Sequence, residues 1–240
     1  MSKEKQRGTQ GVARRTVLTH AGVVTAAFAL GPLVPGVAAA APSTSSKAGR
    51  TARDEAPTSA NGWPVEKEAN HVSTVWTRPV PGTGLSVDIR IGDVEAILLH
   101  VIRRYHYEVE RLHHADLAGW QRIEDLDSDA PESNRASGSA VRIRPGAAAE
   151  GSLFPLQEVV LRDILADCEG VVRWGGDDSP VDESLFYVDR GPADPHVRKL
   201  ADALREGEAR PGQGAGKAVN VMAEARRTRA NDLARKQRER

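Results

Sequence analysis

The sequence predicts an α+β fold, in which a small, antiparallel-type sheet is backed by helices. Short segments with apolar residues at every second position are interspersed with segments whose apolar residues recur every three or four positions. Their order does not follow the repeating strand–helix–strand unit that a parallel sheet needs. With 240 residues, the chain has room for one domain of ordinary size and its tails.

The first expected elements are a strand and the helix that follows it. Residues 84–91 alternate between apolar and polar side chains, which is typical of a half-buried strand. Asp93 is expected to cap a helix whose apolar stripe runs from Val94 to Tyr105. Residues 113–134 are acidic and irregular, and therefore predict a loop.

Three further strands and two further helices are expected after this loop. Pro155 favours the start of a helix that ends before Gly170, because proline fits the first turn and glycine commonly follows the last one. Asp194 and Pro195 begin another helix for the same reason. The strands are expected at residues 140–144, 171–174 and 184–188.

Charge is distributed unevenly, although 33 basic and 33 acidic residues cancel over the whole chain. Residues 41–216 carry 20 Lys and Arg against 29 Asp and Glu, a net charge of −9. An acidic body argues against nucleic-acid binding, because such binding needs a basic face that releases counterions. Cys168 is the single cysteine, which excludes an intrachain disulfide and a cysteine-based zinc ribbon.

The N-terminus has the pattern of an export signal. Residues 1–40 contain a basic start, an apolar stretch and a run of small residues at which a signal peptidase would cut, near Ala40. Arg14 and Arg15 favour the twin-arginine export machinery as a partner, and an ordinary secretory signal is the alternative. We therefore expect a secreted or cell-wall-associated protein with no transmembrane span in the mature chain. Residues 41–62 are expected to form a flexible linker.

The C-terminus is expected to be a linker followed by a basic tail. Residues 206–216 are polar and glycine-rich, whereas residues 217–240 carry eight basic and three acidic side chains. The tail lacks a continuous apolar stripe, so we expect it to be solvated, and helical only when it is held. Its charge could bind anionic wall polymers or lipid headgroups. Deleting it should then leave the melting temperature unchanged.

Four segments resemble the zinc peptidases of the D-alanyl-D-alanine carboxypeptidase and L-alanyl-D-glutamate endopeptidase family. The similarity covers about residues 63–205 and implies a single domain of zinc D,D-peptidase type that acts on peptidoglycan. In that family the second of these segments reads Ser-Asn-His-Ala-Ser-Gly, and the third reads Trp-Gly-Gly-Asp. The four segments in this chain are Tyr105–Glu110, Ser133–Gly146, Gly170–Asp177 and Asp182–Tyr187.

The resemblance implies that the metal-ligand positions have been substituted. The three positions that hold zinc in the family are occupied here by Arg135, Arg142 and Leu185, whereas the general-base position is retained as Asp182. Zinc needs nitrogen, oxygen or thiolate donors, which protonated arginine and leucine do not supply. We therefore expect no cofactor and no metal. Without zinc to lower the pKa of water, hydrolysis by the family mechanism is not expected.

The preferred hypothesis is a pseudopeptidase that binds peptidoglycan stem peptides without cutting them. Arg135 and Arg142 could bind carboxylates, with Asp182 and Asp177 as partners and Trp174 beside the cleft. One alternative is an active carboxypeptidase or endopeptidase with an unrecognised metal site. The other is a secreted structural protein whose pocket is vestigial.

Overall fold

The computed structural model describes residues 57–124 and 127–239. The predicted export signal and most of the linker that follows it lie outside these residues. In the described part of the chain, no helix is both long enough and apolar enough to span a membrane.

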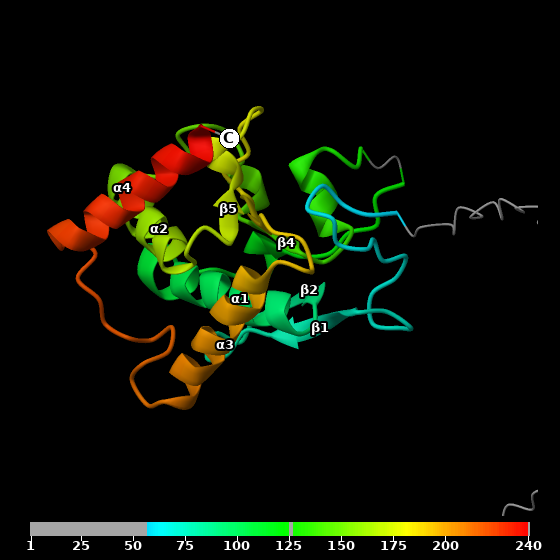
Figure 1. Cartoon of the computed structure of the whole chain (residues 1–240), viewed down its shortest axis with the longest axis horizontal. Coiled ribbons are helices and arrows are strands. Elements are labelled where there is room, and N and C mark those ends of the chain that lie inside the picture. Colours follow the sequence, from blue (N-terminus) through cyan, green and yellow to red (C-terminus); the bar gives the residue numbers. More distant parts are fainter. Residues whose placement is uncertain (1–56, 125–126, 240) are drawn as a thin grey trace, which may run out of the picture. The chain divides into compact units, whose positions relative to one another are not determined.

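Two antiparallel sheets support the fold, which confirms the α+β prediction (Figure 1). A hairpin pairs Trp76 with Ile89, and the strand order in the larger sheet is β3-β4-β6-β5. Each strand of the larger sheet is short, from two to four residues. The strands are β1 (Val75–Pro79), β2 (Ser86–Arg90), β3 (Leu117–Ala118), β4 (Ala140–Ile143), β5 (Val172–Trp174) and β6 (Leu185–Val188).

The helices also follow the predicted apolar spacing. Gly92, with φ +95°, is the N-cap of the first helix, so the prediction that Asp93 caps it is wrong by one residue. Asp194 does cap the third helix, because its side chain accepts a hydrogen bond from the His196 backbone N–H. The helices are α1 (Asp93–Arg104), α2 (Pro155–Asp167), α3 (Pro195–Ala209) and α4 (Glu224–Arg238).

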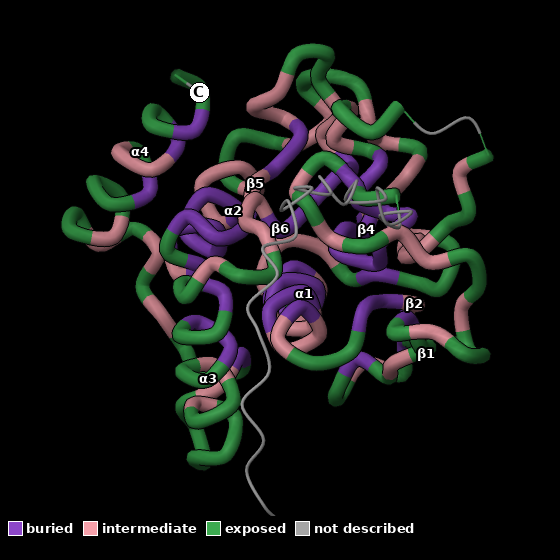
Figure 2. The backbone as a smooth tube through the Cα atoms, turned by 45° about the vertical axis from the view of Figure 1, so that its right-hand side comes forward, coloured by how far each residue is buried: buried purple, intermediate pink, exposed green. Residues whose placement is uncertain are grey.

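Helix α1 lies at the centre of the hydrophobic core (Figure 2). Its buried stripe, which includes Ile97, Leu98 and Val101, packs between the sheets and the other helices. Helix α3 packs against α1, and α4 packs against α2. The chain continues from α1 into a π-helical turn at Tyr105–Val109, the first segment of the family resemblance.

Three sequence-based expectations need correction. Strand β1 was not predicted, because its apolar residues Val75 and Trp76 are adjacent rather than alternating and Pro79 ends it. The expected loop at 113–134 contains β3 and two 3₁₀ turns. Residues 57–62 belong to the folded body, since Ser59 is buried and Asn61 donates a 2.8 Å hydrogen bond to the Val188 carbonyl.

Candidate functional site

The serine-rich segment Ser133–Ser139 holds the N-terminal part of the body against the larger sheet. The Ser133 hydroxyl accepts a 2.8 Å hydrogen bond from the Ala60 N–H, and the Asn134 side chain accepts one of 3.0 Å from the Asn61 N–H. Gly138 has φ +71°, and a Cβ there would lie 2.8 Å from the Arg90 backbone nitrogen. This segment therefore requires its small residues for close packing rather than for chemistry.

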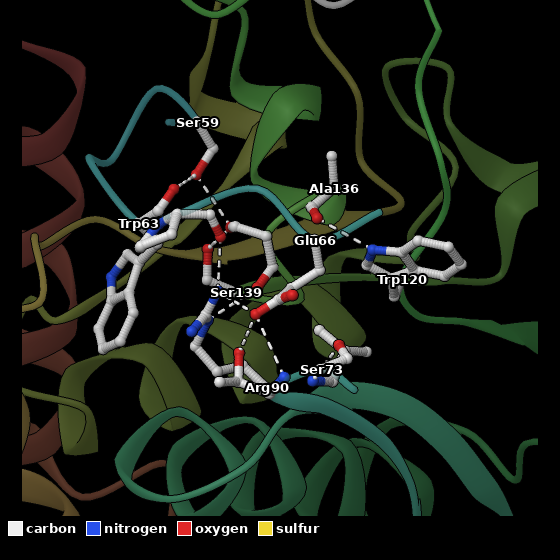
Figure 3. A network of polar contacts seen from close by, with 12 residues as sticks. Ser59, Trp63, Glu66, Ser73, Arg90, Trp120, Ala136 and Ser139 are labelled. Atoms are coloured by element: carbon white, nitrogen blue, oxygen red, sulfur yellow. Dashed lines mark hydrogen bonds and ion pairs between the residues drawn. The ribbon is translucent and has the colours of Figure 1, made fainter. Parts of the chain in front are cut away.

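A buried arginine that the sequence analysis did not single out completes this support (Figure 3). Arg90 donates hydrogen bonds to the carbonyls of Ser137 at 2.8 Å and Pro64 at 2.5 Å, and it lies 3.6 Å from the Glu66 carboxylate. Its guanidinium also lies over the Trp63 ring, 5.3 Å from the centroid. Because Arg90 cross-links three segments that are distant in the sequence, we assign it a structural role.

Two of the predicted site residues form a direct ion pair beside this support. Arg142 extends from β4, and its Nη2 donates a 2.8 Å hydrogen bond to Oδ2 of Asp182. The other Asp182 oxygen accepts hydrogen bonds from the backbone N–H and the hydroxyl of Ser184, at 3.0 and 2.6 Å. The carboxylate is thus held by donors on both oxygens and is oriented toward Arg142.

A second carboxylate, Glu132, bridges the two arginines of the predicted site. Its Oε1 lies 3.1 Å from Nη2 of Arg142 and 3.5 Å from Nη1 of Arg135. Arg135 is buried, and its Nε donates a 3.1 Å hydrogen bond to the Gly119 carbonyl. Burial and the positive charge of Arg142 both lower the pKa of the Arg135 guanidinium. We call Glu132, Arg135, Arg142 and Asp182 the arginine cluster.

Glu132 was missed by the sequence analysis, although a local signal was present. It precedes Arg135 by three positions, a spacing that brings the two side chains together on a helical turn. The segment Pro131–Arg135 does form a 3₁₀ helix. Half of the Glu132 side chain is exposed, at 49%, against 7% for Arg135. Glu132 is therefore the most exposed member of the cluster.

Arg135, Arg142 and Leu185 stand at the positions that the sequence resemblance matches to zinc ligands. They lie close together but offer no metal site. Leu185 pairs with Arg142 in the register of β4 and β6, and its side chain packs with Ala140 and Tyr187. Two guanidinium groups and a leucine have no lone pair for a cation, so these residues do not fit zinc. Among the described residues, no group of three or more His, Cys, Asp or Glu side chains is placed to hold a metal ion.

Trp174 and Asp177 do not join the arginine cluster. The Trp174 Nε1 donates a 2.7 Å hydrogen bond to the Glu183 carbonyl, and the Arg162 guanidinium lies 4.6 Å from the ring centroid. The Asp177 side chain is completely buried and binds Arg162 and Arg238. The expectation that Asp177 pairs with Arg135 or Arg142 is therefore wrong. Trp174 instead positions the loop that carries Asp182.

The other titratable groups considered as sites are buried or engaged elsewhere. Burial raises the pKa of the Cys168 thiol to about 12, which removes thiolate character at neutral pH. Burial also lowers the pKa of His100 to about 4, so its imidazole is neutral. His106 accepts a 3.1 Å hydrogen bond from the Leu112 N–H. None of these geometries suggests a nucleophile or a metal ligand.

Five surface hollows in the described part of the chain are lined by residues other than Arg135, Arg142 and Asp182, and one of these five, of about 380 Å³, is lined in part by Glu132. A hollow of about 520 Å³ separates parts of α2 and α4. Within the arginine cluster, Glu132 and Asp182 already pair with the two guanidinium groups, so a ligand carboxylate would have to displace one of them.

Comparisons with protein-family models, with curated proteins and with solved structures return no match to this chain.

Proposed function

We propose that this protein is exported and binds peptidoglycan stem peptides without cleaving them, as a pseudopeptidase with a zinc D,D-peptidase-like fold. The proposal starts from the resemblance of four sequence segments to that family. It is supported by the placement of Arg135, Arg142, Asp182 and Leu185, which lie together as the family's site residues would. Its localisation rests on the export-signal pattern of residues 1–40.

The bridging position of the Glu132 carboxylate is the observation that carries the proposal. One carboxylate oxygen contacts both Arg135 and Arg142, as the terminal carboxylate of a peptide would. Nε of Arg142 is buried and has no hydrogen-bond partner among the described residues. An incoming carboxylate could therefore replace Glu132 and gain a donor that Glu132 does not use. Since Glu132 is half exposed, its replacement needs only a side-chain rotation.

Hydrolysis has no support in the donor chemistry of this cluster. The family reaction requires a zinc-bound water, whereas the corresponding side chains here are two cations and a hydrocarbon. Asp182 accepts hydrogen bonds from Ser184 and Arg142, so both of its carboxylate oxygens are engaged. We therefore assign Asp182 to orienting Arg142 rather than to general-base catalysis.

A second candidate function, a structural protein with a vestigial pocket, is favoured by one observation. The arginine cluster contains two cations and two carboxylates, so it is balanced without a ligand. If Glu132 is a permanent partner rather than a replaceable one, the cluster only stabilises the fold. The two functions differ in what happens when Glu132 is removed.

Calorimetric titration with an N-acetylated stem pentapeptide ending in D-Ala-D-Ala tests the proposal. The Glu132→Ala variant should bind the peptide at least about tenfold more tightly than wild type, because the internal competitor is gone. Arg142→Ala should abolish binding. Arg144→Ala is the matched control, since Arg144 lies just beyond β4 and pairs with Glu110 instead. No binding by wild type or Glu132→Ala would establish the structural alternative.

Zinc content gives an independent test of the catalytic alternative. Protein purified with excess zinc should hold far less than one equivalent after dialysis. The triple variant Arg135→His, Arg142→Asp and Leu185→His should gain zinc, because the three positions already lie together. Each single reversion should gain little. Stoichiometric zinc in wild type would contradict the proposal and favour an unrecognised metal site.

A further inference from the structure

Helix α4 is held to the body mainly by arginines that reach buried carboxylates. Nε and Nη2 of Arg226 donate 2.7 and 2.6 Å hydrogen bonds to the two oxygens of Asp163, a bidentate arrangement. Nη2 of Arg226 also bonds Asp167 at 2.7 Å. Arg229 adds a second contact to Asp167. The prediction of a solvated C-terminal tail is therefore wrong.

At the C-terminal end of α4, another arginine binds a buried carboxylate, that of Asp177 in the Trp-Gly-Gly-Asp segment. Nε of Arg238 donates a 2.7 Å hydrogen bond to Oδ1 of Asp177. The preceding residue, Gln237, has a buried side chain that donates a 2.9 Å hydrogen bond to the Val172 carbonyl on β5. Helix α4 thus covers part of β5, which is the end strand of the larger sheet.

Apolar contacts add little to this attachment. The buried hydrophobic residues of α4 are Ala230 and Ala234, whose side chains are single methyl groups. Leu233 is partly buried against the core. Because hydrophobic stabilisation scales with the apolar area removed from water, electrostatic contacts dominate the docking of α4.

Every carboxylate that α4 covers also has a partner in the body. Nη2 and Nη1 of Arg104 bond Asp163 at 3.2 Å and Asp167 at 2.8 Å, and Nη2 of Arg162 bonds Asp177 at 2.8 Å. Departure of α4 would leave Asp177 on Arg162, and Asp163 and Asp167 on the single guanidinium of Arg104, which also binds Glu108. This arrangement allows α4 to dissociate without leaving an isolated charge in the interior.

The connection to α3 permits such a movement. Residues 210–223 join the two helices and include Gly212, Gly214 and Gly216. The Glu208 carboxylate accepts hydrogen bonds of 2.5 Å from Arg103 and from the Ala215 N–H, which fix the first half of this connection. Residues after Ala215 can therefore act as a hinge while α3 stays in place.

Three further basic side chains of α4 make no ion pair with the body: Arg227 and Arg235 line the hollow between α2 and α4, and Lys236 lines another hollow beside Ala166 and Glu169. Arg227 and Lys236 are exposed and make no ion pair with any described residue, and Arg235 pairs only with Asp232 of the same helix. The helix contains six basic and two acidic residues. Such a helix attracts polyanions, whereas the body, with a net charge of −9 over residues 41–216, repels them.

We propose that α4 is a releasable binding element for linear polyphosphate-type polyanions. Asp163, Asp167 and Asp177 then act as internal stand-ins for the phosphates of the ligand. Arginine binds both groups through the same fork of donors. Arg227, Arg235 and Lys236, which make no ion pair with the body, make the first contact, and the arginines that hold α4 then exchange their carboxylates for phosphates. This inference is independent of the peptide-binding proposal, because it uses none of the residues of the arginine cluster.

Hydrogen exchange of the full chain, with inorganic polyphosphate as the probe, tests this inference. Polyphosphate should raise the exchange rate of amides near the α4 N-terminus, where the helix is attached by Arg226 and Arg229, at least about tenfold. NaCl at equal ionic strength should have a smaller effect, and α3 amides should not change. Polyphosphate that binds without changing exchange in α4 would overturn the proposal. Release by anionic vesicles but not by polyphosphate would also overturn it.

Two triple variants of α4 separate the arginines that hold the helix from the basic residues that make no ion pair with the body. The variants are comparable because each removes three basic charges. Arg226→Ala, Arg229→Ala and Arg238→Ala together should give fast α4 exchange without polyphosphate. The matched control, Arg227→Ala, Arg235→Ala and Lys236→Ala, should stay docked and need at least about tenfold more polyphosphate for release. Equal polyphosphate sensitivity of this control and wild type would contradict the proposal. If the first triple variant does not fold, Arg238→Ala should show the same increase near the α4 C-terminus.

Discussion

Helices α3 and α4 each contain 15 residues and pack on the same body, but different forces hold them. Helix α3 has equal numbers of basic and acidic residues and buries Val197, Leu200 and Ala201 in the core. Helix α4 carries a net charge of +4 and buries two alanines and a glutamine. The first helix is therefore fixed by the hydrophobic effect, and the second depends on ion pairs that salt, acid and competing anions can weaken.

The largest expected effect is the loss of an apolar side chain from α3. Leu200→Ala should destabilise the protein by about 2–5 kcal/mol, because it leaves a cavity in a well-packed core. Urea denaturation at low salt and at about 1 M NaCl should give the same loss, since the contact is uncharged. Ala203→Gly, an exposed change on the same helix, is the control for helix propensity and should cost about 1 kcal/mol.

Deletion of residues 217–240 should have a smaller but measurable effect on stability. The arginine contacts of α4 contribute roughly 0–1 kcal/mol each where they are exposed, so we expect a loss of about 1–3 kcal/mol. This reverses the expectation from the sequence that the melting temperature would not change. Calorimetric melting of the full and shortened chains provides the measurement. Equal melting temperatures would mean that α4 is not docked in solution.

A single arginine of α4 should give a salt-dependent loss. Arg226→Ala removes the contacts to Asp163 and Asp167, and we expect a cost of about 1–2 kcal/mol at low salt. Part of this cost should disappear in about 1 M NaCl, where charges are screened within about 3 Å. Arg227→Ala is the control, because Arg227 is exposed and makes no ion pair with any described residue. A loss for Arg226→Ala that salt does not reduce would contradict the electrostatic interpretation.

The smallest expected effect is on the acid dependence of stability, which the ion pairs of α4 should change and the apolar contacts of α3 should not. Burial alone would raise the pKa values of Asp167 and Asp177, but hydrogen bonds from arginines, including those of α4, lower them below the ordinary 3.8. Because these pKa values are lower in the folded state, the two carboxylates contribute their full stabilisation above a pH of about 3.8. This stabilisation disappears as the pH falls through the pKa values of the folded state.

The full chain should therefore lose stability more steeply than the shortened chain below pH 3.8, the ordinary carboxyl value. The shortened chain lacks the three α4 arginines that bind Asp167 and Asp177, namely Arg226, Arg229 and Arg238. The pKa values of these carboxyls should therefore be lowered less, and acid should remove less stability. Equilibrium unfolding of both chains across this window measures the difference. Parallel curves would show that the body arginines alone set these pKa values.

Much of the fold could be predicted because its elements leave local patterns in the sequence. The alternation at residues 84–91 identified β2, and the three-to-four spacing after Asp93 identified α1. Strand β1 was not predicted from the sequence, because Arg78 and Pro79 interrupt any alternation of apolar and polar residues, and the apolar Trp76 is exposed. Its pairing with β2 depends on a neighbouring strand rather than on its own composition.

The candidate site was predictable only in part. Family resemblance indicated that Arg135, Arg142 and Asp182 lie close together, and the structure brings all three into one cluster. It did not indicate Glu132, which completes the cluster from the adjacent turn. It also placed Asp177 in the wrong environment, because the arginines that bind it come from α2 and α4.

The sequence by itself determined where apolar faces occur, and hence the α+β class, the helix positions and the absence of zinc donors at the expected positions. Only the tertiary structure decided which charge pairs with which, including the docking of α4 on α2. An apolar side chain leaves a periodic signal because any core will bury it. A charged side chain leaves none, since its partner is set by an approach of a few ångströms between segments that the chain brings together from far apart.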